Sequence, residues 1–239
     1  MVNYKTSHGL AVAIALLAPI VPRAAHAAGP YPTMAPVSQY LMTDRAAEIA
    51  LARTAAPPSI SKDAEVIVLT AHGYVSAGPG KNGFVCMVQR AWFSGVEDKG
   101  FWNPKLRAPV CLNRQGARSV LPTFLTRTNW ALAGVSQDEI RARTIAALKS
   151  GKIPKPELGT VSYMLSKEGY LGDDAGGPWH PHVMFYMPPM KTADWGADLA
   201  GSPVMSTAAG ADPWTMFYVP VAEWSDGTPD AKGAMHHGG

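Results

Sequence analysis

Two histidines separated by one proline are the residues of this sequence with the clearest potential for chemistry. His180 and His182 stand at the start of an expected strand, so their imidazoles lie on one side of the backbone. Two imidazoles placed in this way can hold a divalent metal ion when a third ligand arrives from elsewhere. The candidate third ligands are Asp173 and Asp174, in the Gly-rich loop before the pair, and the distant His72.

The same histidines have two other interpretations. An H-x-H pattern is common by chance, and no H-E-x-x-H or comparable second ligand motif accompanies it. They could equally serve as metal-free polar or acid–base groups, or be ordinary hydrogen-bonded or exposed histidines. Asp173 and Asp174 are also typical of a solvated turn, and they lack the alternating spacing of a calcium loop. The cofactor is therefore open, with a divalent metal as the one candidate.

A near-repeat of eight residues is the most informative pattern in the sequence. Residues 181–188 read Pro-His-Val-Met-Phe-Tyr-Met-Pro and residues 213–220 read Pro-Trp-Thr-Met-Phe-Tyr-Val-Pro, so five of eight positions agree. Two copies are too few for a solenoid. The simplest interpretation is two similar strands of one sheet, each bounded by prolines, and the alternative is an old duplication or pseudo-symmetric site.

Alternation along these two strands predicts a binding surface. Side chains two residues apart share a face of a strand. One face is wholly apolar, with Phe185, Met187, Phe217 and Val219. The other face combines His182, Met184, Tyr186, Trp214, Met216 and Tyr218. This mixed face suits a ligand better than a dry core, because each buried Tyr hydroxyl or Trp N–H needs a partner.

We therefore name Tyr186, Trp214 and Tyr218 as candidate ligand-binding residues and add Trp179, which adjoins both the Asp-Gly loop and the histidine pair. The competing interpretation is that helices cover both faces of the sheet and the tyrosines hydrogen-bond inside the core. Tryptophans in loops also commonly plug the core beneath the loop.

Several familiar motifs fail on context. Residues 78–83 fit G-x-G-x-x-G, but a strand follows them, so no helix N-terminus is available for a pyrophosphate. Residues 59–62 fit S-x-x-K within a Pro-Pro loop, without the other elements of a penicillin-recognising enzyme. No G-x-S-x-G occurs. These observations disfavour a nucleotide-binding enzyme, a penicillin-recognising enzyme and an α/β-hydrolase, and no family resemblance emerges.

The N-terminus has the pattern of a signal peptide. Lys5 precedes an apolar run over 10–21, and Ala25-His26-Ala27 supplies small residues for cleavage after Ala27. The run is shorter than the roughly 20 residues that a membrane span needs. We therefore expect residues 1–27 to be removed, leaving a periplasmic or secreted protein without a membrane anchor.

An exported chain changes what its two cysteines predict. In an oxidising compartment, Cys86 and Cys111 are a disulfide candidate, whereas the alternative is two separately buried thiols. The net charge of +3 is small, and no window gathers five or six basic residues. A nucleic-acid partner is therefore not expected.

The remaining sequence indicates helices of ordinary length. Ser38 is a candidate N-cap for a helix over 39–54. A further helix is expected over 122–133. The clearest is the one that begins at the capping box over 136–139 and stops near Gly151.

Strands are expected over 64–70 and 84–93, before the two copies of the repeat. We predict one α+β domain over 38–230, with an antiparallel sheet packed by two or three helices on one face. A Pro-rich leader over 28–37 and a flexible Gly/His tail over 231–239 flank it.

The function that these patterns favour is binding of a small molecule or an envelope component on the polar-aromatic sheet face. The alternative is a metal-dependent or acid–base hydrolase that uses His180 and His182, completed by Asp173, Asp174 or His72. A structural or partner-interaction protein without a pocket is the third. The sequence does not decide whether the protein is an enzyme, nor its oligomeric state.

Overall fold

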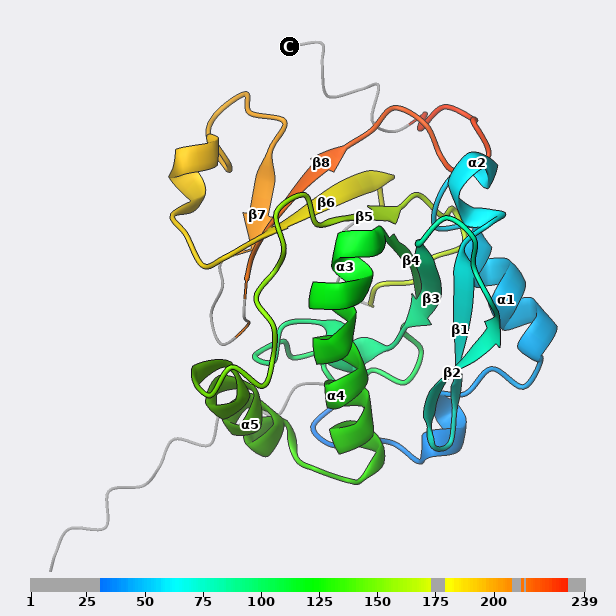
Figure 1. The fold of residues 1–239 in the computed structure, drawn as a ribbon, viewed down its shortest axis with the longest axis vertical. Helices are drawn as coiled ribbons and strands as arrows, with labels where there is room; N and C mark the ends of the chain where they lie inside the picture. The colour runs from blue at the N-terminus through cyan, green and yellow to red at the C-terminus, as the bar shows by residue number, and fades with distance from the viewer. Residues whose placement is uncertain (1–30, 173–178, 208–211, 213, 232–239) are drawn as a thin grey trace, which may run out of the picture.

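A computed structural model describes residues 31–172, 179–207, 212 and 214–231. Within these residues, eight strands form one mixed sheet in the order β2-β1-β3-β4-β5-β6-β8-β7 (Figure 1). The pair β1 and β3 is parallel and every other neighbouring pair is antiparallel. The strands are β1 (Glu65–Thr70), β2 (Gly73–Gly78), β3 (Val85–Gln89), β4 (Ala108–Leu112), β5 (Val161–Met164), β6 (His182–Met187), β7 (Met205–Thr207) and β8 (Thr215–Pro220).

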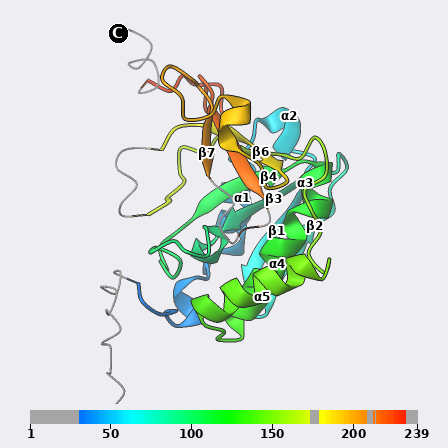
Figure 2. The same ribbon diagram turned by 90° about the vertical axis from the view of Figure 1, so that its left-hand side faces the viewer.

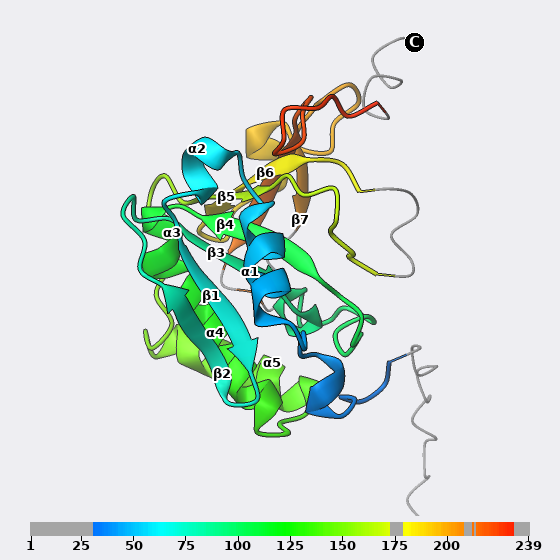
Figure 3. The same cartoon turned by 90° about the vertical axis from the view of Figure 1, so that its right-hand side faces the viewer.

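Helices cover both faces of this sheet. The α-helices of the described residues are α1 (Arg45–Arg53), α2 (Pro58–Ser61), α3 (Arg114–Ser119), α4 (Leu121–Leu132) and α5 (Gln137–Lys149). Figure 2 shows α4 and α5 beside the sheet, and Figure 3 shows α1 across its opposite face. The mixed α+β class is thus as predicted, but the helices do not lie on one face alone.

The reason for two covered faces is the composition of the central strands. All five residues of β3 and all five of β4 are buried. In β1, Val66 and Val68 pack with Ala52 of α1, whereas Ile67 and Leu69 belong to the core cluster that contains Phe124 of α4. A strand that is apolar on both faces needs cover on both.

A disulfide joins the adjacent strands β3 and β4. Cys86 of β3 and Cys111 of β4 stand directly opposite each other in register and are bonded, as the sequence predicts. Both are fully buried, in the core cluster beneath α1.

Helix α5 begins at its predicted N-cap, whereas helix α1 does not. The Ser136 side chain accepts from the Glu139 amide, so α5 begins where the capping box places it. The helix expected over 39–54 instead begins at Arg45, with Asp44 as its N-cap. The Tyr40 carbonyl accepts a 2.6 Å hydrogen bond from Arg90 Nε. That carbonyl is committed to a distant residue, and Val37–Gln39 forms only a short 3-10 turn, η1.

The expected strand over 84–93 is also shorter than predicted. It ends at Gln89, and Ala91–Phe93 forms a 3-10 turn, η2. The turn begins after Arg90, whose guanidinium bonds back to the Val88 carbonyl and to Glu48. This bend brings Phe93 over the sheet.

The two copies of the repeat are neighbouring strands of the same sheet. Strands β6 and β8 pair antiparallel, with Met184 opposite Tyr218 and Phe185 opposite Phe217. On the apolar face, a third 3-10 turn, η3 (Thr192–Trp195), places Trp195 on Phe217, with ring centroids 4.5 Å apart and nearly parallel planes. The mixed face of β6 and β8 lies on the other side of the sheet from Trp195.

No helix among the described residues is both long and apolar enough to cross a membrane.

Candidate functional site

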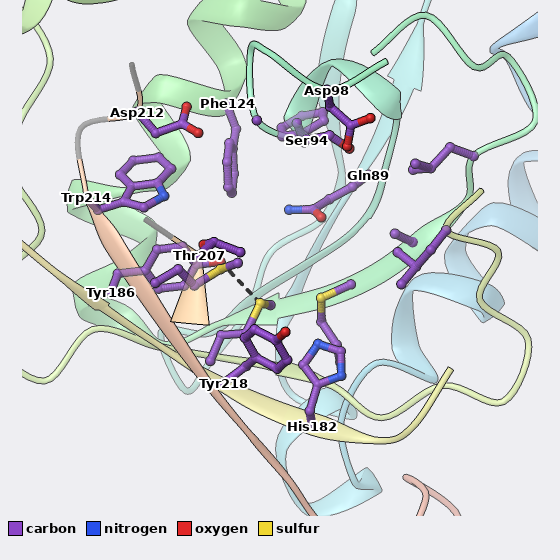
Figure 4. A pocket seen from close by; sticks show the side chains of 18 of the residues that line it. Gln89, Ser94, Asp98, Phe124, His182, Tyr186, Thr207, Asp212, Trp214 and Tyr218 are labelled. Carbon is purple, nitrogen blue, oxygen red and sulfur yellow. Dashed lines mark hydrogen bonds between the residues drawn. The ribbon is translucent and has the colours of Figure 1, made fainter. Parts of the chain in front are cut away.

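A pocket of about 520 Å³ lies on the mixed face of β6 and β8 (Figure 4). Its size falls within the range of small-molecule sites. One wall is the sheet, to which β6, β8 and the residue before β8 contribute the six side chains of the predicted mixed face: His182, Met184, Tyr186, Trp214, Met216 and Tyr218. Alternation therefore brings together in one cavity every residue that the sequence assigned to this face.

The opposite wall comes from the segment after β3 and from α4. Gln89 is the last residue of β3, and η2 with the loop behind it supplies Phe93, Ser94 and Asp98. Phe124 closes this side from α4, with its ring edge-on to Trp214 at 5.6 Å and to Phe93 at 4.6 Å. Aromatic rings thus pack across the two walls at one end of the pocket.

Trp179 lines the pocket at the other end. Its indole N–H donates to the Ser166 carbonyl at 2.7 Å, and its ring lies edge-on to His182 at 5.2 Å. A β-carbon at Gly169 would lie 3.2 Å from the indole ring, so only a glycine allows this approach without a shift. Trp179 is therefore a fixed wall, and its ring is the part available to a ligand.

His182 presents one defined nitrogen to the pocket. Its Nδ1 lies 2.8 Å from the His180 carbonyl oxygen. A carbonyl oxygen only accepts, so Nδ1 carries the proton. Burial lowers the pKa of His182; the hydrogen bond to the His180 carbonyl opposes this shift, and the charge of the His180 ring adds slightly to it. The ring is consequently a neutral imidazole whose Nε2 is a hydrogen-bond acceptor.

His180 points elsewhere. Its Nδ1 lies 2.6 Å from Oδ2 of Asp230, a carboxylate that is almost fully buried. Although the two histidines are two residues apart, His182 lines the pocket and His180 does not. The reason is that Pro181 precedes β6, so His180 lies outside the strand and does not follow its alternation.

The two tyrosines of the mixed face differ in what they offer. Tyr186 is buried, shares a hydrogen bond with Ser162, and has its pKa raised by burial to about 12. It therefore serves chiefly as part of the wall, as the core-packing alternative anticipates. Tyr218 is less buried, and its hydroxyl has no hydrogen-bond partner among the described residues. Burial and the nearby Asp198 raise the Tyr218 pKa, so its hydroxyl stays protonated.

The charged groups at the pocket are mostly neutralised within the protein. Arg90 is fully buried and donates to Glu48 Oε1 at 2.8 Å, to the Tyr40 carbonyl and to the Val88 carbonyl. Asp212 pairs with the fully buried Arg127 of α4. Asp98 is the remaining carboxylate of the lining, and it is exposed to solvent.

Arg127 itself keeps two guanidinium nitrogens, Nε and Nη1, without a hydrogen-bond partner in the described part of the chain. It is not among the residues that line the pocket.

The predicted metal-binding residues are not brought together. His72 lies in the turn between β1 and β2, at the opposite edge of the sheet. Four strand spacings separate β1 from β6, which amounts to roughly 19 Å. Asp173 and Asp174 lie outside the described residues. Within the described ranges, no group of three His, Cys, Asp or Glu side chains is placed to hold a metal ion.

Sequence reasoning missed the wall that faces β6 and β8, which includes Gln89, Ser94 and Phe124. A signal was present in part, because Gln89 and Arg90 are adjacent polar residues within an apolar run. Gln89 is a largely buried residue that lines the pocket, and its side-chain amide makes no hydrogen bond within the described residues, so the amide is available to a ligand. Phe124 carries no such signal, because its position follows only from the packing of α4 on the sheet.

Comparisons of the chain with protein-family models, with curated proteins and with solved structures find no match. The function must therefore be argued from the site itself.

Proposed function

We propose that this chain is an exported binding protein that holds a small, largely apolar molecule in the pocket between β6, β8 and the segment that follows β3. The observation that supports this most is the composition of the pocket. Rings and thioethers form its walls, and Gln89, His182 and Tyr218 offer polar atoms without partners in the described residues. Apolar walls with a few placed polar groups are typical of small-molecule sites.

Export is part of this proposal. The signal-peptide pattern over residues 1–27 supports it, and so does the disulfide between Cys86 and Cys111. Disulfides persist mainly in oxidising compartments such as the periplasm or the extracellular space.

A fluorescence titration of the mature chain tests the binding function. The probe is N-phenyl-1-naphthylamine, an uncharged aromatic compound that fluoresces strongly when it leaves water. We expect saturable binding to one site. Ser94→Trp adds an indole to the pocket wall and should abolish the signal, because Ser94 lines the pocket.

Ser59→Trp is the matched control. Ser59 is exposed on α2 and lies outside the pocket lining, so this variant should bind the probe like the wild type. Absence of saturable binding to the folded wild-type chain, or equal binding by both tryptophan variants, would show that the pocket is not a binding site.

A further inference from the structure

The polar groups of His182 and Tyr218, at one corner of the pocket, restrict the chemical class of the ligand further. His182 is flanked by Trp179 at 5.2 Å and by Tyr218 at 5.7 Å between ring centroids. Its orientation is also held by the bond from Nδ1 to the His180 carbonyl. Figure 4 shows His182 and Tyr218 reaching into the same part of the pocket from neighbouring strands. Nε2 of His182 is therefore a preorganised acceptor, and the Tyr218 hydroxyl stands beside it.

These two groups together match a hydroxyl better than other polar groups. Nε2 requires a donor, and the Tyr218 hydroxyl both donates and accepts. A ligand hydroxyl donates to one atom and accepts from another, so it can satisfy both side chains at once. A single N–H group would satisfy only Nε2, and a carbonyl would satisfy only the Tyr218 O–H; an NH2 group could donate to both atoms but would leave the Tyr218 O–H without an acceptor.

The charges around the pocket favour an uncharged ligand. All three guanidinium nitrogens of Arg90 already bond to Glu48 or to backbone carbonyls, so this cation has few N–H groups left to bind an anionic ligand. Asp98, at the exposed side, would repel an anion. Asp212 is already paired with Arg127. A cation in the apolar interior would lack a free buried counter-ion among these lining residues, at a high desolvation cost.

We propose that the pocket binds an uncharged ring compound through a hydroxyl group that donates to His182 Nε2 and accepts from the Tyr218 hydroxyl. This inference rests on the proposed binding function and adds the chemical class of the ligand. The aromatic rings of Trp179, Phe124 and Trp214 would contact the ring system of that compound.

Three naphthalene derivatives of similar shape test the proposal by displacing N-phenyl-1-naphthylamine at pH 7.5. They are 2-naphthol, which donates and accepts, 2-methoxynaphthalene, which only accepts, and 2-naphthoate, which is an anion. We expect 2-naphthol to bind about tenfold more tightly than 2-methoxynaphthalene, a difference of the size of one good hydrogen bond. The anion should bind most weakly.

Two variants assign the hydrogen bonds. His182→Phe removes the acceptor, so it should weaken 2-naphthol about tenfold while 2-methoxynaphthalene changes less than about twofold. Tyr218→Phe removes the donor and should weaken both compounds. Tyr163→Phe is the matched control, because Tyr163 lies on β5 outside the pocket lining. Retained affinity for 2-methoxynaphthalene in His182→Phe also shows that this variant is folded.

The outcomes separate the two proposals. If the fluorescent probe itself does not bind, the binding function fails and this inference fails with it. If the probe binds but the hydroxyl and methoxy compounds compete equally, the binding function stands and the hydroxyl inference is overturned. Tightest competition by 2-naphthoate would overturn it too, in favour of an anion site.

Discussion

At the scale of single residues, the two histidines of the H-x-H pattern have separate environments. His182 donates through Nδ1 to a backbone carbonyl and exposes Nε2 to the pocket, whereas His180 pairs with Asp230. The tautomer of His182 is thus set by a residue two positions away. A hydrogen bond from Nδ1 to a nearby backbone carbonyl can thus leave Nε2 as the acceptor, without a metal ion or a carboxylate as partner.

The lowered pKa of His182 predicts a pH dependence of stability. In the unfolded chain the imidazole has an ordinary pKa near 6.5, and in the folded chain it binds a proton only at lower pH. Between these values the unfolded state binds more protons, so the free energy of unfolding falls as the pH falls below about 6.5. The contribution is fully present above that pH.

Urea unfolding of the wild type and of His182→Gln, measured from pH 7.5 downward, checks this. The variant should lose less stability over the acidic range, because it lacks the titrating ring. His72→Gln is the control, since His72 is exposed in a hairpin turn, and its curve should follow the wild type. Parallel curves for the wild type and His182→Gln would contradict the prediction.

At the scale of elements, the start of α1 shows how tertiary contacts override a local signal. Tyr40 is fully buried, its hydroxyl donates to the Trp102 carbonyl at 2.8 Å, and its own carbonyl accepts from Arg90. These bonds hold the chain before Asp44 in a non-helical path. Asp44 then caps the helix by accepting from the amides of Ala46 and Ala47.

Alanine substitution distinguishes the two candidate caps. Asp44→Ala should lower the free energy of unfolding by about 1 kcal/mol, the usual cost of losing an N-cap. Ser38→Ala should change it by less than about 0.5 kcal/mol, because Ser38 is exposed and caps nothing in η1. Chemical denaturation of both variants measures the difference. A larger loss of stability for Ser38→Ala than for Asp44→Ala would contradict the assignment of Asp44 as the N-cap.

At the scale of the whole molecule, one sheet supports two different surfaces. Its central strands are covered on both faces, by α1 on one side and by α3 and α4 on the other, with α5 packed against α4. Beyond β5, the mixed face of β6 and β8 is covered only partly, by Phe124 and by the segment after β3. The pocket exists where the helical cover ends.

The disulfide predicts a large effect on global stability, because it closes a loop of 25 residues between the adjacent strands β3 and β4. The double variant Cys86→Ala/Cys111→Ala should lose about 3 kcal/mol in the chain-entropy model. A loss below about 1 kcal/mol in urea unfolding would contradict this. Reductant should lower the stability of the wild type and leave the variant unchanged, since the described residues contain no free cysteine.

Much of the candidate site follows from local patterns. Period-two alternation in the near-repeat is sufficient to group His182, Tyr186, Trp214 and Tyr218 on one face, and the structure has all four around one pocket. The cysteine pair and the cap at Ser136 are predictable in the same way. These features depend on residues close together in sequence, or on a general rule for strands or for cysteine pairs in oxidising compartments.

The tertiary structure alone decided which of these groups remain free for a ligand. Tyr186 bonds to Ser162, and Arg90 pairs with Glu48, because the fold brings together residues that are distant in sequence. The strand order likewise keeps His72 away from His182. By itself, the sequence determined a polar-aromatic face, because alternation is a local effect, and made Cys86 and Cys111 a disulfide candidate whose pairing the structure then showed. The opposite wall of the pocket came only from packing, because long-range contacts leave no period in the sequence.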